Sequence, residues 1–418
     1  MPTDSPGLGV HPFRATTYAA HTPDDLARVS SPAYDLVTAA GRARLASADP
    51  HNVVRLILPA VPAGPGDAAE RDRRSAAQAA ASLRDWRATG VLVDDPDPTM
   101  WLYRMSGPGD EVTTGWLGAV DLPHPGSTAV LPHEDVYAPA VEGRRVLLAA
   151  TRTDLEPVVL AHDPSPETAA IAATVAAGPA DLDVQDDDGV RHQLWRVAEP
   201  GTLAGLTAGF ASTEAVIADG HHRVAAARQH AGGGDGRVLA LLTPMGPGGL
   251  RVQAIHRVVP GLGLESAVAA AAAGFTVTPL SADHPAELVP SWGAQPGTGA
   301  LLLTDGRRTV ELSDPTAEVR SRIPVDAPPS WRSLDVVLAH HGLLAGLWGV
   351  PDDPAAVRVA HDVPEALRLA AETAGVALLL RSPSPSDVAA VARAGARMPR
   401  KSTLFVPKPR TGLVFRPH

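Results

Sequence analysis

Short apolar runs alternate with longer helical patterns along most of this chain, and this alternation restricts the folds that it can adopt. Residues 215–218 and 376–380 are continuous apolar runs of strand length, and helical sequence lies beside each of them. Residues 70–89 instead place apolar side chains at every third or fourth position, and Gly90 follows as a stop signal. This alternation predicts a mixed α/β (α+β) fold.

Other segments give further predictions of local structure. Residues 100–105 and 116–122 are predicted to be the two strands of a hairpin, joined by a Gly-rich turn at residues 107–110. The β-branched run at residues 52–58 predicts another strand. Residues 385–394 predict a short helix near the C-terminal end.

The length of the chain indicates more than one folding region. Its 418 residues exceed an ordinary single domain, and an apolar content of 44% is enough to fill a core. We divide the sequence into an N-terminal α/β region at residues 1–125, a central core at residues 126–260 and a C-terminal α/β region at residues 261–418.

The balance of charged residues excludes several classes of partner. The chain has 36 Lys and Arg against 46 Asp and Glu, a net charge of −10, whereas proteins that bind a phosphate backbone are ordinarily basic. It has no cysteine and no secretory signal pattern, and its longest apolar run, at residues 267–275, is too short to span a membrane. We therefore expect a cytoplasmic protein with no DNA, RNA or membrane partner.

The strongest local motif follows the apolar run at residues 215–218. The sequence Asp-Gly-His-His-Arg separates this run from an Ala-rich helical pattern, so its glycine is predicted to lie at a strand-to-helix turn. The first N–H groups of a helix bind anions because they have no partner within the helix and the helix dipole is positive there. Glycine leaves room for an anion, and arginine adds a bidentate phosphate donor. The candidate phosphate-binding residues are Asp219, Gly220, His221, His222 and Arg223.

The two adjacent histidines of this motif also have a simpler explanation. Neighbouring positions on a helix point in different directions, so His221 and His222 cannot chelate one metal from the same face. One imidazole can instead lie in the core while the other faces solvent. The residue types are compatible with a structural helix start as well as with a phosphate site.

A second candidate lies upstream, where an apolar run leads into Pro132 and then into His133, Glu134 and Asp135. A carboxylate beside an imidazole can act as a general base or hold a divalent ion. The alternative is the first turn of a helix, where acidic side chains interact favourably with the dipole. Residues 186–188, three aspartates before a predicted strand, are a weaker metal candidate and are typical of a solvated turn.

The chain contains only two lysines, Lys401 and Lys408. A compact ammonium group suits a phosphate or carboxylate in a tight pocket better than a guanidinium group does. Lys401 is followed by Ser402 and Thr403 but lacks the preceding glycines of a P-loop. These three residues are predicted as possible phosphate or substrate contacts, and the alternative is that both lysines are ordinary surface residues.

Several short stretches, spread in order along the whole chain, carry a family resemblance. They are PFR (12–14), PAYD (32–35), NVVRL (52–56), LPHE (131–134), LLAATR (147–152), HQLWR (192–196), ADGHHR (218–223), HRVV (256–259), MPRKST (398–403), PK (407–408) and TGLV (411–414). Together they resemble, nearly end to end, the bacterial and archaeal family known as domain of unknown function 1015. Two positions depart from it, since Ala33 stands where a second proline is expected and Arg144 where an aspartate is expected.

A more local resemblance covers about residues 131–228. The order of a Pro-His-Glu segment and an Asp-Gly-His turn is similar to the ParB/sulfiredoxin-like fold, and most of all to its free serine kinase branch. The resemblance implies a ParB-like nucleotide-binding core at residues 126–260, with additional α/β elements at both ends. It implies Glu134, together with His133, as the catalytic group near a substrate hydroxyl, and residues 220–223 as the phosphate cradle. It also implies Mg²⁺ with ATP or ADP, and assigns no residue to the metal.

These features predict a nucleotide-dependent kinase that acts on the hydroxyl of a small metabolite, with free serine as the candidate. Its partners would be a nucleotide and a small-molecule substrate, with Glu134 across one cleft from residues 220–223. One alternative is a ParB-like nucleotide-binding switch or partner-binding protein without phosphotransfer. Another is a metal-dependent hydrolase built on His133, Glu134, His221 and His222. The sequence leaves the substrate, the choice between ATP and ADP, and the oligomeric state open.

Overall fold

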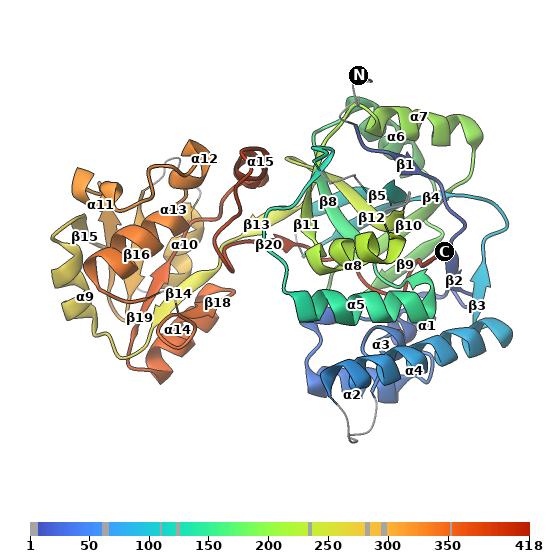
Figure 1. Ribbon diagram of the computed structural model, residues 1–418, viewed down its shortest axis with the longest axis horizontal. Coiled ribbons are helices and arrows are strands. Elements are labelled where there is room, and N and C mark those ends of the chain that lie inside the picture. The colour runs from blue at the N-terminus through green and yellow to red at the C-terminus, as the bar shows by residue number, and fades with distance from the viewer. Residues whose placement is uncertain are drawn as a thin grey trace. The chain divides into compact units, whose positions relative to one another are not determined.

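Figure 1 shows the computed structural model of the protein, which describes residues 7–60, 67–108, 111–122, 126–232, 236–280, 285–293, 299–351 and 353–418. The chain divides into two compact units, which we name unit 1 and unit 2. Unit 1 comprises Met1–Leu250 and Pro407–His418, and unit 2 comprises Arg251–Val406. The C-terminal segment therefore returns to unit 1.

Unit 1 contains helices and strands in alternation. Its strands are β1 (Val10–His11), β2 (Thr16–Tyr18), β3 (Leu92–Asp94), β4 (Met100–Ser106), β5 (Val112–Asp121), β6 (Val130–Leu131), β7 (Thr153–Asp154), β8 (Val158–His162), β9 (Leu182–Gln185), β10 (Arg191–Val197), β11 (Ala215–Asp219), β12 (Arg237–Pro244) and β21 (Arg416–Pro417). Its helices are α1 (Pro23–Val29), the 3₁₀-helix η1 (Tyr34–Leu36), α2 (Ala39–Ala48), α3 (Val54–Ile57), α4 (Ala68–Ala88), α5 (Ala138–Thr151), α6 (Pro166–Val175), α7 (Pro200–Phe210) and α8 (His221–Ala231).

The described residues of unit 1 form a nine-stranded mixed sheet in the order β6-β11-β8-β12-β5-β4-β10-β9, with β1 also paired to β5. β11 is parallel to β6 and antiparallel to β8, whereas β12 is parallel to β8. Helix α8 packs against β8 and β12, and α5 packs between α8 and α4 (Figure 1). Leu160, Ile217, Val224 and Leu242 from this region belong to one buried cluster. The end of β11 and the start of α8 are thereby fixed by the core.

Unit 2 is built around a smaller sheet. Its strands are β13 (Arg251–Gln253), β14 (His256–Val259), β15 (Thr276–Leu280), β16 (Leu301–Thr304), β17 (Thr309–Ser313), β18 (Arg358–Ala360), β19 (Val376–Leu379) and β20 (Leu404–Val406). Its helices are α9 (Leu264–Ala271), α10 (Pro285–Gly293), α11 (Ala317–Ser321), α12 (Pro329–Arg332), α13 (Asp335–Val337), the π-helix η2 (Leu338–Leu347), α14 (Val363–Glu372) and α15 (Pro385–Arg393). The described strands form a six-stranded sheet in the order β15-β17-β16-β19-β14-β18 and a separate β13–β20 pair.

The structure confirms the predicted mixed α/β fold and several of its elements. The predicted helix at residues 70–89 is α4, and that at residues 385–394 is α15. The predicted hairpin is the antiparallel pair β4 and β5; residues 109–110 of its predicted turn lie outside the described residues. Within the part of the chain that the structure describes, no helix is long and apolar enough to cross a membrane.

The predicted strand at residues 52–58 is wrong, because this run contains the short helix α3. Asn52 is fully buried, and its side-chain oxygen accepts a hydrogen bond from the Val54 N–H at 3.0 Å. Val54, Leu56 and Ile57 are all buried in the helix. This local side-chain to backbone hydrogen bond and tertiary packing therefore override the β-propensity of the run.

The three predicted regions differ from the two compact units. The predicted boundary after residue 125 falls between β5 and β6, which belong to the same sheet. The predicted C-terminal region ends in unit 1, because β21 pairs with β7 there. Sheet pairing between segments that are distant in the sequence accounts for both differences.

Candidate active site

The predicted strand-to-helix turn is present at the end of a buried strand. β11 ends at Asp219, Gly220 has a φ of 93°, and α8 begins at His221. This left-handed conformation favours glycine. A Cβ at this position would lie 3.0 Å from side-chain atoms of both Val158 and Arg223. The backbone conformation and the packing therefore both require glycine here.

The start of α8 has no side-chain cap. The first helical hydrogen bond runs from the Val224 N–H to the Gly220 carbonyl oxygen at 2.9 Å. The N–H groups that precede it have no partner within the helix, and the helix dipole adds positive charge at this end. The local geometry is thus that of an anion-binding helix start.

His221 connects this helix start to Glu134. The imidazole is 3% exposed, and its Nε2 accepts a hydrogen bond from the His133 backbone N–H at 3.3 Å. Because Nε2 accepts, the ring proton lies on Nδ1, which faces the Glu134 Oε1 at 3.3 Å. The Glu134 side chain is 44% exposed. The predicted base and the predicted turn are therefore in direct contact, closer than the cleft expected between them.

His222 holds the same loop at a second point. Its Nε2 accepts a hydrogen bond from the Tyr137 backbone N–H at 3.1 Å. The two adjacent imidazoles thus bind two N–H groups of one loop, which keeps Glu134 against the helix start. Within the described residues, no group of three or more His, Cys, Asp and Glu side chains is arranged to hold a metal ion.

His133, predicted as part of the catalytic pair, lies in the core. It is 1% exposed, and its Nδ1 donates to the Ile217 carbonyl oxygen at 2.6 Å. Its ring packs edge-on against His221, with 4.6 Å between the ring centroids. Burial, and then the neighbouring His221, lowers the pKa of His133 to about 4. A neutral, buried imidazole in this position supports His221 and leaves Glu134 as the exposed group.

Asp219 and Arg223 form the inner side of the turn. The Arg223 Nη2 lies 2.5 Å from the Asp219 Oδ2, and its Nη1 donates to the Pro157 carbonyl oxygen at 2.6 Å. Only 13% of the Arg223 side chain is exposed. Each terminal nitrogen of Arg223 makes one of these two contacts, and Arg223 thereby holds Asp219 in place. Its role as a phosphate donor stays a prediction.

Lys408 completes this ionic cluster and was not among the predicted site residues. Its Nζ donates to the Asp219 Oδ1 at 2.9 Å and also to Asp35, and 8% of its side chain is exposed. Burial opposes ionisation of Asp219, but Arg223 and Lys408 outweigh it and hold the pKa of this carboxyl below its usual range. The only signal in the sequence was the scarcity of lysine.

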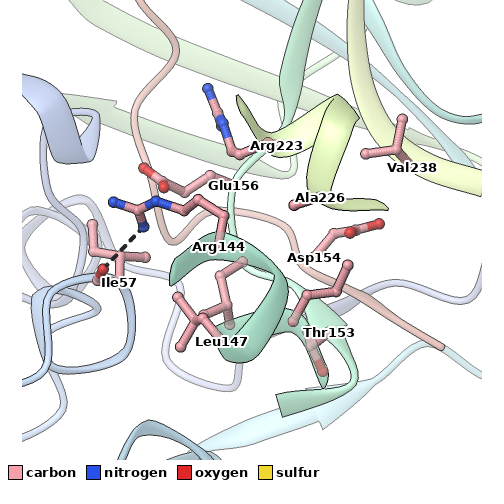
Figure 2. Close-up of a pocket in the computed structure, with 11 residues that line it drawn as sticks. Ile57, Arg144, Leu147, Thr153, Asp154, Glu156, Arg223, Ala226 and Val238 are labelled. Carbon is pink, nitrogen blue, oxygen red and sulfur yellow. Dashed lines mark hydrogen bonds between the residues drawn. The ribbon is translucent and has the colours of Figure 1, made fainter. Parts of the chain in front are cut away.

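A small cavity of about 50 Å³ lies behind Arg223 (Figure 2). Arg144 extends from α5 into this region and donates to the Ile57 carbonyl oxygen at 3.4 Å, the interaction marked by the dashed line in Figure 2. Glu156 and Asp154 contribute carboxylates to the lining. A cavity of this size holds water but excludes a nucleotide.

The other predicted contacts lie in unit 2. Lys401 is exposed and has a left-handed φ of 51°. Ser402 is buried, and its hydroxyl donates to the Pro399 carbonyl oxygen at 2.6 Å. Thr403 is partly buried beside them. The structure thus brings Glu134 together with residues 219–223 in unit 1, whereas residues 401–403 belong to unit 2.

The geometry defines a mixed α/β protein with a carboxylate held beside the first residue of helix α8. The chain belongs to the family described as "Protein of unknown function (DUF1015)", whose model matches residues 10–337. Over these residues the match confirms the resemblance to domain of unknown function 1015. A comparison with the curated proteins finds no match.

Several solved structures are similar to parts of this chain. A free serine kinase in complex with AMP has 15% identity and a TM-score of 0.33, covering 69% of this chain and 86% of its own. SbnI with a C-terminal truncation from Staphylococcus aureus has 11% identity and a TM-score of 0.35, covering 69% and 82%. A conserved hypothetical protein from Pyrococcus furiosus has 15% identity and a TM-score of 0.33, covering 69% and 90%. Overlap at these scores assigns no activity to this chain.

Proposed function

We propose that this protein is a nucleotide-dependent phosphotransferase that acts on the hydroxyl of a small metabolite. The observation that carries the proposal is the half-exposed Glu134 carboxylate, 3.3 Å from the imidazole of His221, the first residue of a helix whose N-cap is a glycine. Phosphoryl transfer needs chiefly positioning and charge neutralisation. An anion-binding helix start beside an oriented carboxylate supplies both requirements.

Each residue has a distinct part in the proposed reaction. The substrate oxygen attacks the terminal phosphorus, Glu134 accepts the hydroxyl proton, and the bond from phosphorus to the leaving nucleotide breaks, so that ATP yields ADP or ADP yields AMP. His221 orients Glu134 through Nδ1. The start of α8 receives the phosphates, while Arg223 and Lys408 hold Asp219 and so fix the turn.

The proposed cofactor is Mg²⁺, and the proposed substrate is free serine. Mg²⁺ would arrive with the phosphates and neutralise part of their charge, since no metal-binding group is formed among the described residues. Free serine is the candidate substrate because the loop of Glu134 and the turn of His221 resemble those of free serine kinases in sequence. The same resemblance supports a ParB/sulfiredoxin-like core around β11 and α8.

The proposal is tested by incubating the purified full-length protein with Mg²⁺, ATP or ADP, and a panel of hydroxyl metabolites that includes serine. We expect one phosphorylated product, detected by mass spectrometry and ³¹P NMR, with one nucleotide converted per product. Nucleotide binding without any product would instead support the switch-protein alternative. The absence of both nucleotide binding and phosphorylated product would overturn the proposal.

A further inference from the structure

Unit 1 contains a second, much larger cavity of about 610 Å³ that the site described so far does not use. Helix α2, the segment around η1, the turn between β9 and β10, and the C-terminal segment all contribute to its lining. Pockets of this volume are typical of sites for nucleotide-sized ligands. A free amino acid would fill only a small part of it.

The inner end of this cavity reaches the candidate active site through Lys408. Lys408 lines the cavity and donates to the Asp219 carboxylate, which directly precedes Gly220. Asp219 and Asp35 raise the pKa of Lys408 although burial opposes this, so the ammonium stays charged. The positive charges of Lys408 and Arg223 balance those of the two aspartates. The positive end of α8 is adjacent to this cluster and favours a phosphate there.

One wall of the cavity is a fixed polar network. The Arg410 backbone N–H donates to the Tyr103 hydroxyl oxygen at 2.9 Å, and that hydroxyl donates to the His192 Nδ1 at 2.9 Å. The His192 Nε2 then donates to the Asp186 carboxylate at 3.1 Å. His192 and Tyr103 are 2% and 1% exposed. This chain of donors and acceptors fixes the turn that carries Asp187.

The outer part of the cavity combines an apolar surface with carboxylates. Leu36 lines it and is a large apolar side chain that is 54% exposed. Asp187 and Asp188 also line it, and Asp187 is 96% exposed. An apolar contact beside carboxylate acceptors suits a base and a sugar with free hydroxyl groups.

We propose that this cavity binds the nucleoside part of a nucleoside di- or triphosphate, with the phosphates directed toward Lys408 and the start of α8. The inference rests on the proposed phosphotransferase function and specifies where its nucleotide binds. The base and ribose lie along Leu36 and Asp187, and Lys408 contacts the phosphates. Glu134 and the cavity adjoin opposite ends of one short turn, from Asp219 to His221.

The inference is tested by titrating ADP into the full-length protein and two tryptophan variants, using isothermal calorimetry. Ala40 lines the cavity and is exposed on α2, whereas Ala43 is exposed on the same helix and does not line it. Ala40→Trp fills the cavity and should weaken ADP binding by about tenfold or more, while Ala43→Trp should bind as wild type does. Leu36→Glu, at another exposed position, should also weaken binding because its carboxylate repels the nucleotide.

A second pair of ligands tests the orientation. Lys408→Met removes the ammonium and should weaken ADP binding by about tenfold while changing adenosine binding little, because adenosine has no phosphate. Ala40→Trp should weaken the binding of both ligands. Thermal melting of each variant confirms that it is folded.

The outcomes separate this inference from the proposed function. If wild type binds ADP and makes product, but Ala40→Trp and Leu36→Glu bind ADP equally well, the cavity assignment is overturned and the kinase proposal stands. If the variants lose ADP affinity but wild type makes no product, the nucleotide site stands and the kinase proposal fails. Wild type that binds neither ADP nor ATP and makes no product overturns both.

Discussion

The turn at residues 219–223 in unit 1 and the segment at residues 401–403 in unit 2 have the same predicted ligand but different structures. In the turn, side chains are buried and held by ion pairs, and His221 contacts Glu134. In the segment, Lys401 is exposed, and the Ser402 hydroxyl is bound to a backbone carbonyl oxygen. A buried strand that leads directly into a helix fixes donors in space, whereas an irregular segment with an exposed lysine does not. We therefore expect variants of the turn to have large effects and variants of the segment small ones.

Glu134→Gln should give the largest effect on activity. Glutamine keeps the size of the side chain and an oxygen that can accept from His221, but loses the proton acceptor. Turnover should fall by about 10²–10⁴-fold while nucleotide binding stays nearly intact. Steady-state kinetics and calorimetry measure the two quantities separately. Glu265→Gln in unit 2, at a position with an 85% exposed side chain, is the control. Full turnover by Glu134→Gln would remove the proposed base.

Arg223→Ala should give the largest effect on stability. It removes a largely buried partner of Asp219, so we expect the free energy of unfolding to fall by about 3–5 kcal/mol, with weaker nucleotide binding as a consequence of the disturbed turn. Arg368 in unit 2 also forms an i,i+4 pair, with Glu372, but there both side chains are more than half exposed. Arg368→Ala should cause no measurable change in the free energy of unfolding. Chemical denaturation measures both variants. Equal losses of unfolding free energy for Arg223→Ala and Arg368→Ala would contradict the difference between the two regions.

The local part of the site could be predicted from the sequence, and its long-range part could not. An apolar run, Asp-Gly and an Ala-rich pattern suffice to predict β11, the turn at Gly220 and α8, because neighbouring residues decide them. The contact of Lys408 with Asp219 joins positions 189 residues apart, and the inward direction of Arg223 depends on the Pro157 carbonyl oxygen. Only tertiary packing decides these contacts.

The same distinction holds for the fold. The prediction for residues 70–89 succeeded because a long amphipathic pattern specifies its own helix. The prediction for residues 52–58 failed because the buried Asn52 and its packing partners select a helix for a β-branched run. The proximity of Glu134 to His221 was expected from the local resemblance to the ParB/sulfiredoxin-like fold, but the reason for it was not. Each of the two histidines accepts a backbone N–H from the loop of Glu134.

Acid should destabilise both units through buried histidines. Burial lowers the pKa of His133 to about 4, with a further contribution from His221, and burial also lowers that of His256 in unit 2 to about 4, with a contribution from Arg257. The unfolded chain binds these protons below about pH 6.5, so stability is full above that pH and is lost as the pH falls toward about 4. Each histidine contributes roughly 3 kcal/mol to this loss. Hydrogen exchange at pH 7 and pH 4.5 should show this loss of stability in each unit.

His133→Gln separates the two units in this experiment. The variant keeps a donor for the Ile217 carbonyl oxygen but has no titrating group. It should reduce the acid sensitivity of amides in unit 1 and leave that of amides around His256 unchanged. A reduction in both units, or in neither, would show that His133 is not the titrating group.

Gly220→Ala should destabilise the protein by about 1–3 kcal/mol, because alanine would need a left-handed backbone and close contacts with Val158 and Arg223. Gly263 also precedes a helix, α9 in unit 2, but has a φ of −70° and no atom within 4 Å of a Cβ. Gly263→Ala is therefore the matched control and should be close to neutral. Chemical denaturation compares the two, and a neutral Gly220→Ala would show that the turn can relax.

Lys401→Gly should have the smallest effect. The two interpretations of Lys401, as a surface residue or as a contact of the phosphates or the substrate, predict different results for this variant. Lys401 is exposed and has a φ of 51°, a conformation that glycine adopts without strain. If Lys401 is a surface residue, the variant should keep wild-type turnover and gain at most about 1 kcal/mol of stability. If Lys401 instead contacts the phosphates or the substrate, the variant should lose turnover or raise KM by about tenfold while its stability stays unchanged. We expect the first result, because the ammonium is exposed to solvent. Measuring kcat, KM and thermal melting on the same preparation distinguishes the two, and a loss of activity without a loss of stability would place residues 401–403 in the site after all.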